Sequence, residues 1–329
     1  MALISCGIDE AGYGPMLGPL CVGLACFRVE NWQGQTHTPD LWELLSSGVC
    51  RTLKEHRADK RGRVVIADSK QLKLSNQSKT RHPLTHLERA ALTLLGSAGV
   101  NAPDDGHLFA ALGATLPKES WYAGEAIELP LGSSAGEIAI ATNVLGSAMQ
   151  DAAVTAEELA CIAVGEQRFN QIVRAEGTKS EVTVSAIGTH LRTIERRFKE
   201  SGDDVRIVCD RLGARMRYAD LIERELPGTR ATCLMETPER SIYKLEGWSG
   251  DARVMFEIDS EAAHLPVACA SIFAKLTREL AMARFNRYFS GMLAELKPTA
   301  GYYTDARRWL DDADAILDAP TRKKLVRLG

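Results

Sequence analysis

A short apolar segment near the start of the chain ends abruptly in acidic residues and glycines. Leu3–Ile8 is mostly apolar, and the segment Asp9-Glu10-Ala11-Gly12-Tyr13-Gly14-Pro15 follows it directly. An apolar run of this length bounded by a glycine-rich turn is typical of a buried β-strand. A second apolar run, Leu20–Val29, predicts a partner strand in a hairpin. The start of the chain therefore predicts a sheet with carboxylates where its first strand ends.

The rest of the chain contains both short strand-like runs and longer helical patterns. Strands are predicted at Arg63–Ala67, Val205–Cys209, Arg230–Met235, Ile242–Leu245 and Arg253–Ile258. Helices are predicted at Ser185–Glu200, Arg215–Leu226, Pro266–Phe289 and Leu310–Leu317. The strand at Arg63–Ala67 is followed by a predicted loop, Asp68-Ser69-Lys70-Gln71-Leu72.

Charge is nearly balanced over the chain but unevenly distributed. The 329 residues include 40 basic and 43 acidic side chains, a net charge of −3 that excludes a histone-like protein. Residues 51–82 hold ten Lys or Arg against three acids, whereas residues 101–165 hold nine acids against Lys118. We expect the basic segment to be a charged face that could bind a nucleic-acid duplex, and the first half of the acidic segment to be a surface insertion.

The cysteines and the absence of apolar spans indicate a soluble protein of a reducing compartment. None of the eight cysteines forms a Cys-x-x-Cys pair, which argues against zinc and disulfide frameworks. The N-terminus does not resemble a signal peptide, and no stretch of about 18 apolar residues could span a bilayer. We therefore expect a cytoplasmic protein without a membrane partner.

Acidic residues at the ends of apolar runs are the candidate catalytic groups. Asp9 and Glu10 end the first predicted strand, Asp210 ends the strand Val205–Cys209, and Glu279 lies on the long helix. Acids at the carboxyl edge of parallel strands, without zinc-type ligands, suit a hard cation such as Mg²⁺. Most acids in any chain are nevertheless solvated, so a shared site is one of two open interpretations.

The long helix carries a further pattern. Ser271, Lys275 and Glu279 recur at every fourth residue and share one face, and small residues around them allow close approach to a sheet. Such a helix could bring the Glu279 carboxylate to the strand ends. The alternative is an ordinary surface pair of Lys275 with Glu279.

Five segments taken together resemble the type 2 ribonucleases H, which comprise ribonucleases HII and HIII. The segments are "GIDEAGYGPMLGPLCVG", "ADSKQL", "IVCDRLG", "VACASIFAKLTREL" and "TAGYYTD", and they occur in the order found in that family. Each segment is weak evidence alone, and five in order are strong evidence. One departure is Gly12-Tyr13-Gly14, where the family has Arg or Lys between the glycines.

The resemblance implies an α/β fold of the ribonuclease H type, a mixed β-sheet flanked by helices. It implies one catalytic domain over residues 1–329, with an acidic insertion at about 95–185 and a C-terminal helical segment at about 298–329. The implied activity is metal-dependent endonucleolytic hydrolysis of the RNA strand of RNA–DNA hybrids, or at ribonucleotides embedded in DNA. A monomer is expected.

The resemblance also assigns roles to residues. The family's four metal-binding acids correspond to Asp9, Glu10, Asp210 and Glu279, which would be the catalytic residues and would hold Mg²⁺ or Mn²⁺. Substrate contacts are implied for Gly12, Tyr13, Gly14, Ser69, Lys70, Lys275 and Tyr302, with Tyr303 as an alternative to Tyr302. Two other functions stay open: a nucleic-acid-binding protein without nuclease activity, and a ribonuclease H-like nuclease acting on DNA junctions or flaps.

Overall fold

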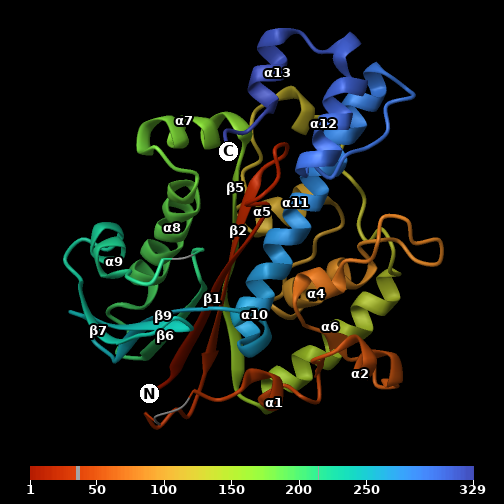
Figure 1. Cartoon of the computed structure of the whole chain (residues 1–329). Helices are drawn as coiled ribbons and strands as arrows, with labels where there is room; N and C mark the ends of the chain where they lie inside the picture. The colour runs from red at the N-terminus through yellow and green to blue at the C-terminus, as the bar shows by residue number, and fades with distance from the viewer. Residues whose placement is uncertain (35–37, 214) are drawn as a thin grey trace.

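The protein is built on one large mixed sheet, seen in a computed structural model that describes residues 1–34, 38–213 and 215–329. In these residues seven strands form the sheet, in the order β5-β2-β1-β6-β9-β8-β7 (Figure 1). The strands are β1 (Leu3–Ala11), β2 (Leu20–Val29), β5 (Val154–Val164), β6 (Asp204–Asp210), β7 (Arg230–Glu236), β8 (Arg240–Glu246) and β9 (Ala252–Glu257). β1, β6 and β9 run parallel, and the outer strands pair antiparallel. β3 (Val49–Cys50) and β4 (Val64–Val65) form a separate parallel pair.

Helices cover both faces of the sheet, which confirms the predicted fold class. The helices are α1 (Leu41–Leu44), α2 (Leu53–Ala58), α3 (Ser69–Leu72), α4 (Thr85–Ser97), α5 (Asp105–Ala111), α6 (Ala135–Asp151), α7 (Glu166–Glu176), α8 (Ser180–Phe198), α9 (Ala219–Glu225), α10 (Ser260–Ala263), α11 (Leu265–Met292), α12 (Tyr303–Asp312) and α13 (Ala319–Leu325). Short 3₁₀ turns lie at Ser120–Tyr122 and Asp314–Ile316. α7, α8 and α9 lie on one side of the sheet and α4, α6 and α11 on the other (Figure 1). Each side has its own apolar core.

The predicted hairpin is confirmed, but its first strand is longer than expected. β1 continues to Ala11, because Asp9, Glu10 and Ala11 still pair with Gly23, Val22 and Cys21 of β2. The two acids therefore belong to the last residues of the strand and are held by its hydrogen bonds. Consecutive residues of a strand face opposite sides of a sheet, so Asp9 and Glu10 start from opposite faces.

The small residues of the long helix allow the close approach that was predicted. α11 packs directly on β1 and β2. A Cβ at Gly7 would lie 2.2 Å from the Val267 nitrogen, and one at Gly23 would lie 2.0 Å from the Ala270 carbonyl oxygen. The glycines of the strands and the alanines of the helix thus bring the start of α11 against the two central strands. This contact places Ser271 beside the end of β1.

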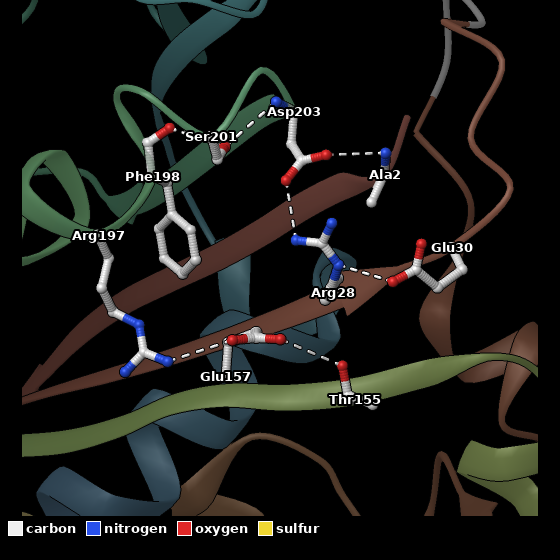
Figure 2. A network of polar contacts seen from close by, with 9 residues as sticks. All are labelled: Ala2, Arg28, Glu30, Thr155, Glu157, Arg197, Phe198, Ser201 and Asp203. Carbon is white, nitrogen blue, oxygen red and sulfur yellow. Dashed lines mark hydrogen bonds and ion pairs between the residues drawn. The ribbon is translucent and has the colours of Figure 1, made fainter.

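A polar network at the opposite end of the sheet sets the relative register of β1 and β6 (Figure 2). The Asp203 carboxylate accepts hydrogen bonds from the Ala2 amide at 3.0 Å and from Arg28 Nη1 at 2.8 Å. Arg28 also pairs with Glu30 at 2.7 Å. β1 and β6 then run in register from Leu3 beside Asp204 to Ile8 beside Cys209. Continued by one residue, this register places Asp9 next to Asp210.

The acidic segment predicted to hold an insertion contributes to the sheet and to its core. β5 pairs antiparallel with β2 from Val154 to Val164, with one register shift between Cys26 and Phe27. Earlier in the segment, Leu108, Phe109 and Leu145 are buried in the same core as α11. Leu108 and Phe109 belong to the first half of the segment, so part of that half packs into the core and not on the surface where it was expected.

The C-terminal segment forms a third apolar cluster at the end of α11. Trp309 and Leu310 of α12 and Leu325 of α13 pack there with Phe285 and Phe289. The helix predicted at Leu310–Leu317 is in fact α12 followed by a 3₁₀ turn, because the helix begins seven residues earlier, at Tyr303, and its C-cap is Ala313.

The described residues include all eight cysteines, and each of them has a free thiol. Within the same ranges, no helix combines the length and apolar character needed to cross a membrane.

Candidate metal centre

Two of the predicted acids meet at the carboxyl edge of the central parallel strands. Asp9 lies near the end of β1, and Asp210 is the last residue of β6. Asp9 is 5% exposed and Asp210 is half-buried. The Ser260 hydroxyl donates a hydrogen bond to Asp210 Oδ1 at 3.1 Å. The sheet edge therefore holds two neighbouring carboxylates, as the sequence predicts.

The third member of the cluster is Glu261, which sequence reasoning missed. Each of Asp9, Asp210 and Glu261 offers a carboxylate oxygen, and these three oxygens lie within 4.8 Å of one another. Glu261 lies on α10, which follows β9, the third parallel strand. The signal that singled out Asp9 and Asp210, an acid at the end of a strand, falls on Glu257 in this strand and so does not identify Glu261.

Burial and mutual repulsion both act on the carboxylates of the cluster. Burial raises the pKa of Asp9 well above its ordinary value, and repulsion from Glu10 and Glu261 raises it further. Burial likewise raises the pKa of Asp210 and that of Glu261. Lys70 opposes this repulsion with an ion pair of 3.1 Å from its Nζ to Glu261 Oε1. Clustered carboxylate oxygens with raised pKa values are the donor set that a hard divalent cation prefers, so the residues fit Mg²⁺ or Mn²⁺.

Glu10 lies at the same edge but outside the group of three oxygens found among the described residues. It lines the cavity that contains the cluster. Burial, together with repulsion from Asp210 and Glu261, raises the pKa of Glu10 to about 7. Glu10 is therefore coupled to the cluster by charge, although its side chain starts from the other face of β1.

Glu279 is not brought to the cluster, which corrects the prediction from the helix pattern. Its carboxylate pairs with Lys275 Nζ at 2.9 Å and lies 3.9 Å from Lys73 Nζ. Among the described residues, Glu279 is not in any group that could share an ion. Ser271, which hydrogen-bonds Asp9, is eight residues earlier on α11. Eight helical residues span about 12 Å, so the helix carries Glu279 past the strand ends.

Most of the predicted substrate-binding residues line the cavity around the cluster. The cavity has a volume of about 190 Å³. The predicted residues along its wall are Gly12, Tyr13, Ser69, Lys70, Lys275 and Tyr302. Among the described residues on that wall, four are acidic and two are lysines. Gly14 is exposed and is not part of the lining.

The segment predicted as a loop at Asp68–Leu72 contains a short helix, α3. The Asp68 side chain accepts a hydrogen bond from the Lys70 amide at 2.8 Å and thereby caps this helix. The Ser69 hydroxyl lies 2.9 Å from that of Ser271, which joins α3 to α11 beside Asp9. The cap and this contact present Lys70 to the acidic cluster.

Two buried arginines, Arg278 and Arg327, contact the loop that carries Tyr13. Gly12 has a φ of 91°, and a Cβ there would lie 2.5 Å from Arg278 Nε. Arg278 is fully buried and donates to the Leu17 and Ala300 carbonyls. Arg327 donates to the Gly12 carbonyl at 2.6 Å. The backbone of the loop is thus held rigidly beside the acids.

The two candidate tyrosines differ in their positions. Tyr302 is 48% exposed, lines the cavity, and has the Arg278 guanidinium carbon 5.6 Å from its ring centre. Tyr303 is 60% exposed, does not line the cavity, and bonds to Arg307 through its hydroxyl at 2.9 Å. The geometry therefore favours Tyr302 as the residue that faces the cluster.

The basic segment 51–82 reaches the cluster at its C-terminal part. Lys70 pairs with Glu261 of the cluster, whereas Lys73 lies beside Glu279, outside it. Two of the other cations are held by acids in their own neighbourhood, namely Arg51 by Asp40 and Arg63 by Asp59.

Comparison with known proteins gave matches among solved structures. No family model and no curated protein matches the sequence. Ribonuclease HII of Archaeoglobus fulgidus, solved with PCNA, is 15% identical at a TM-score of 0.43, with 99% of this chain and 94% of that chain covered. Ribonuclease H2 of Pyrococcus horikoshii OT3 is 16% identical at a TM-score of 0.39, with coverages of 98% and 92%. Bst ribonuclease HIII in complex with Mn²⁺ is 14% identical at a TM-score of 0.37, with coverages of 99% and 66%. These solved structures are type 2 ribonucleases H, the family that the motifs resemble, and the likeness concerns the fold.

Proposed function

We propose that this protein is a metal-dependent endonuclease that cuts the RNA strand of RNA–DNA hybrids, or cuts DNA at embedded ribonucleotides. The observation that carries the proposal is the meeting of Asp9, Asp210 and Glu261 within 4.8 Å at the edge of the parallel strands. The five motifs that resemble type 2 ribonucleases H support it, since each of them contributes residues to the cavity around this cluster.

The cluster would hold Mg²⁺ or Mn²⁺ through Asp9, Asp210 and Glu261. When bound, such a cation supplies activation of a water molecule and stabilisation of charge on the leaving oxygen. Binding would also offset the burial that raises the pKa values of the three acids, and the repulsion that adds to it at Asp9 and Glu261.

Other residues of the cavity would bind the substrate or complete the acidic site. Lys70 and Lys275 line the wall and would face the phosphates of the cut strand. Glu10 lines the same wall and would add a further carboxylate beside the bound cation.

Selection of RNA would come from contacts to the sugar. The exposed Tyr302 ring can pack on a sugar beside the cluster. Gly14 is exposed, and among the described residues nothing lies within 4 Å of the place where its Cβ would be. A strand can therefore approach this backbone closely, which suits recognition of a 2′-hydroxyl.

The test is cleavage of three labelled duplexes in Mg²⁺ and in Mn²⁺: an RNA–DNA hybrid, a DNA duplex with one ribonucleotide, and an all-DNA duplex. The wild-type protein is expected to cut the first or the second and to leave the third intact. Asp210→Asn should lose cleavage by orders of magnitude and keep its fold, while Asp220→Asn, an exposed acid on α9, serves as the control. Cutting of all-DNA duplexes, junctions or flaps would indicate a DNA nuclease, and binding without cleavage would indicate a binding protein.

A further inference from the structure

A second cavity adjoins the acidic one on the far side of Glu10 and Tyr13. Its volume is about 390 Å³, and both of these residues line it as well as the acidic cavity. Its remaining wall includes Ser180, Thr183 and Arg215. A volume of this size lies in the range of small-molecule pockets, which begins at about 300 Å³. The two cavities thus share the end of β1 and Tyr13 as part of their walls.

Thr183 in the wall of this cavity has a buried hydroxyl without a partner. Its side chain is 1% exposed, and within the described part of the chain its Oγ1 has no hydrogen bond. Thr189 and Thr193 on the same helix donate to the carbonyls of Ser185 and Thr189, at 3.0 and 3.1 Å. An unpaired buried hydroxyl costs about 1–3 kcal/mol, so this hydroxyl at the wall of the cavity points to a bound polar group.

The same side of the cavity is positive. The wall holds the start of α8, a helix of 19 residues, and among the described residues no side chain caps it. Lys179, the residue before the helix, has its Nζ 4.9 Å from the centre of the Tyr13 ring. Arg215 stands in the wall and pairs with Glu181 at 3.3 Å. A helix N-terminus with two cations beside it favours an anion such as a phosphate.

Other residues of the wall are apolar. Tyr13 supplies an aromatic ring, and Leu212 and Val184 supply aliphatic surface. The cavity therefore combines a place for a phosphate, a free hydroxyl and a surface against which a sugar or base can pack. A nucleotide has a phosphate, polar groups that accept hydrogen bonds, and a sugar and base that can pack on such a surface. The acids of the adjoining cavity would act on the phosphodiester bond that joins this nucleotide to the next.

We propose that this cavity is a subsite for the nucleotide next to the cleaved phosphodiester bond, with its phosphate toward α8, Lys179 and Arg215. The proposal rests on the proposed function and adds Thr183, Lys179 and Arg215 as residues that bind the strand. Thr183 would donate a hydrogen bond to the bound nucleotide, and Tyr13 would separate this subsite from the acidic cluster.

The experiment measures binding of a fluorescent RNA–DNA hybrid to the full-length protein in EDTA, where the strand is not cut. Thr183→Val removes the hydroxyl and keeps the shape, and Thr189→Val is the matched control, because Thr189 is exposed on the same helix. Thr183→Val is expected to bind the hybrid about fivefold more weakly, with unchanged or higher stability in urea. Lys179→Met should weaken binding and lower the slope of log K against log salt by about 0.9.

The outcomes separate this subsite from the proposed function. If the wild-type protein binds and cuts the hybrid but Thr183→Val binds as well as wild type, the subsite is refuted and the nuclease stands. A loss of stability in Thr183→Val would also refute it, since the hydroxyl would then have a partner within the protein. If the wild-type protein neither binds nor cuts the hybrid, both proposals fail.

Discussion

Arg327 and Gly12 lie 315 positions apart in the sequence, yet Arg327 Nη1 donates a hydrogen bond of 2.6 Å to the Gly12 carbonyl. The same guanidinium donates to the Tyr13 carbonyl at 2.9 Å and lies 3.9 Å from the ring centre of Phe169. Burial lowers the pKa of Arg327 to about 10. The loop beside the acidic cluster therefore takes its shape partly from a side chain near the other end of the sequence.

Arg327→Met should loosen this loop. The methionine keeps an apolar stem over Phe169 but removes the donors, so the two loop carbonyls lose their partner. We expect a loss of about 2 kcal/mol in the free energy of unfolding and roughly tenfold weaker hybrid binding. Arg322→Met is the control, because Arg322 is more exposed and bonds to Leu310 and Asp314 of its own segment. Equal effects of the two substitutions on hybrid binding would show that Arg327 does not position the loop.

The identity of the acid that joins Asp9 and Asp210 can be decided by a pair of substitutions. Glu261→Gln should abolish the rise in Tm on adding Mg²⁺ or Mn²⁺ and reduce cleavage by orders of magnitude, because an amide cannot supply the ligand charge. Glu279→Gln should keep the metal-dependent rise in Tm, since that carboxylate pairs with Lys275. If calorimetry showed that Glu261→Gln keeps the metal-dependent rise in Tm and Glu279→Gln loses it, Glu279 on α11 would be the metal ligand.

The two glycines around Tyr13 should respond differently to alanine. Gly12→Ala should cost about 1–3 kcal/mol in urea unfolding, because Gly12 has a φ of 91° and its Cβ would meet Arg278. Gly14→Ala should change stability by less than about 0.5 kcal/mol, since Gly14 is exposed with open space around it. Hybrid binding should nevertheless weaken in Gly14→Ala, because the methyl group stands where a strand would approach. Unchanged affinity would exclude a backbone contact at Gly14.

Stability should also depend on pH through Glu166, which is not a member of the acidic cluster. Glu166 is buried, accepts hydrogen bonds from the Gly18 amide and the Tyr122 hydroxyl, and has its pKa raised by burial from 4.5 to about 7. The folded state therefore holds this proton more tightly than the unfolded state. The stabilisation is complete below pH 4.5 and is lost as the pH rises through about 7.

Urea unfolding at pH 5 and pH 8 checks this dependence. The wild-type protein should lose on the order of 2 kcal/mol more than Glu166→Gln between the two pH values. Glu176→Gln, an exposed position on the same helix, should behave as wild type. A wild-type loss no larger than that of Glu166→Gln would mean that Glu166 is ionised throughout.

The acids at the strand ends were predictable, whereas the acid on the short helix was not predicted. Asp9 and Asp210 each follow a run of apolar residues, and such a run specifies a buried strand by itself. Glu261 follows β9 at a distance of four residues, on a helix of four residues that is too short for any periodicity. Its role comes from the packing of α10 against the end of β6.

The sequence by itself determined the strands of the large sheet other than β5, the acids Asp9 and Asp210 at their ends, and the small-residue face of α11, because apolar spacing and side-chain size act locally along the chain. Tertiary structure decided which carboxylates share a site. Close contact with Gly7 and Gly23 fixes the first turns of α11 against the central strands, so Ser271 lies beside Asp9. Glu279 lies eight residues further along the helix, about 12 Å beyond Ser271, and does not reach the cluster. Tertiary structure also brought Arg327 to the Gly12 carbonyl and placed Thr183 in the same cavity wall as Tyr13. These residues are far apart in the sequence, so no local pattern of residues predicts that they meet.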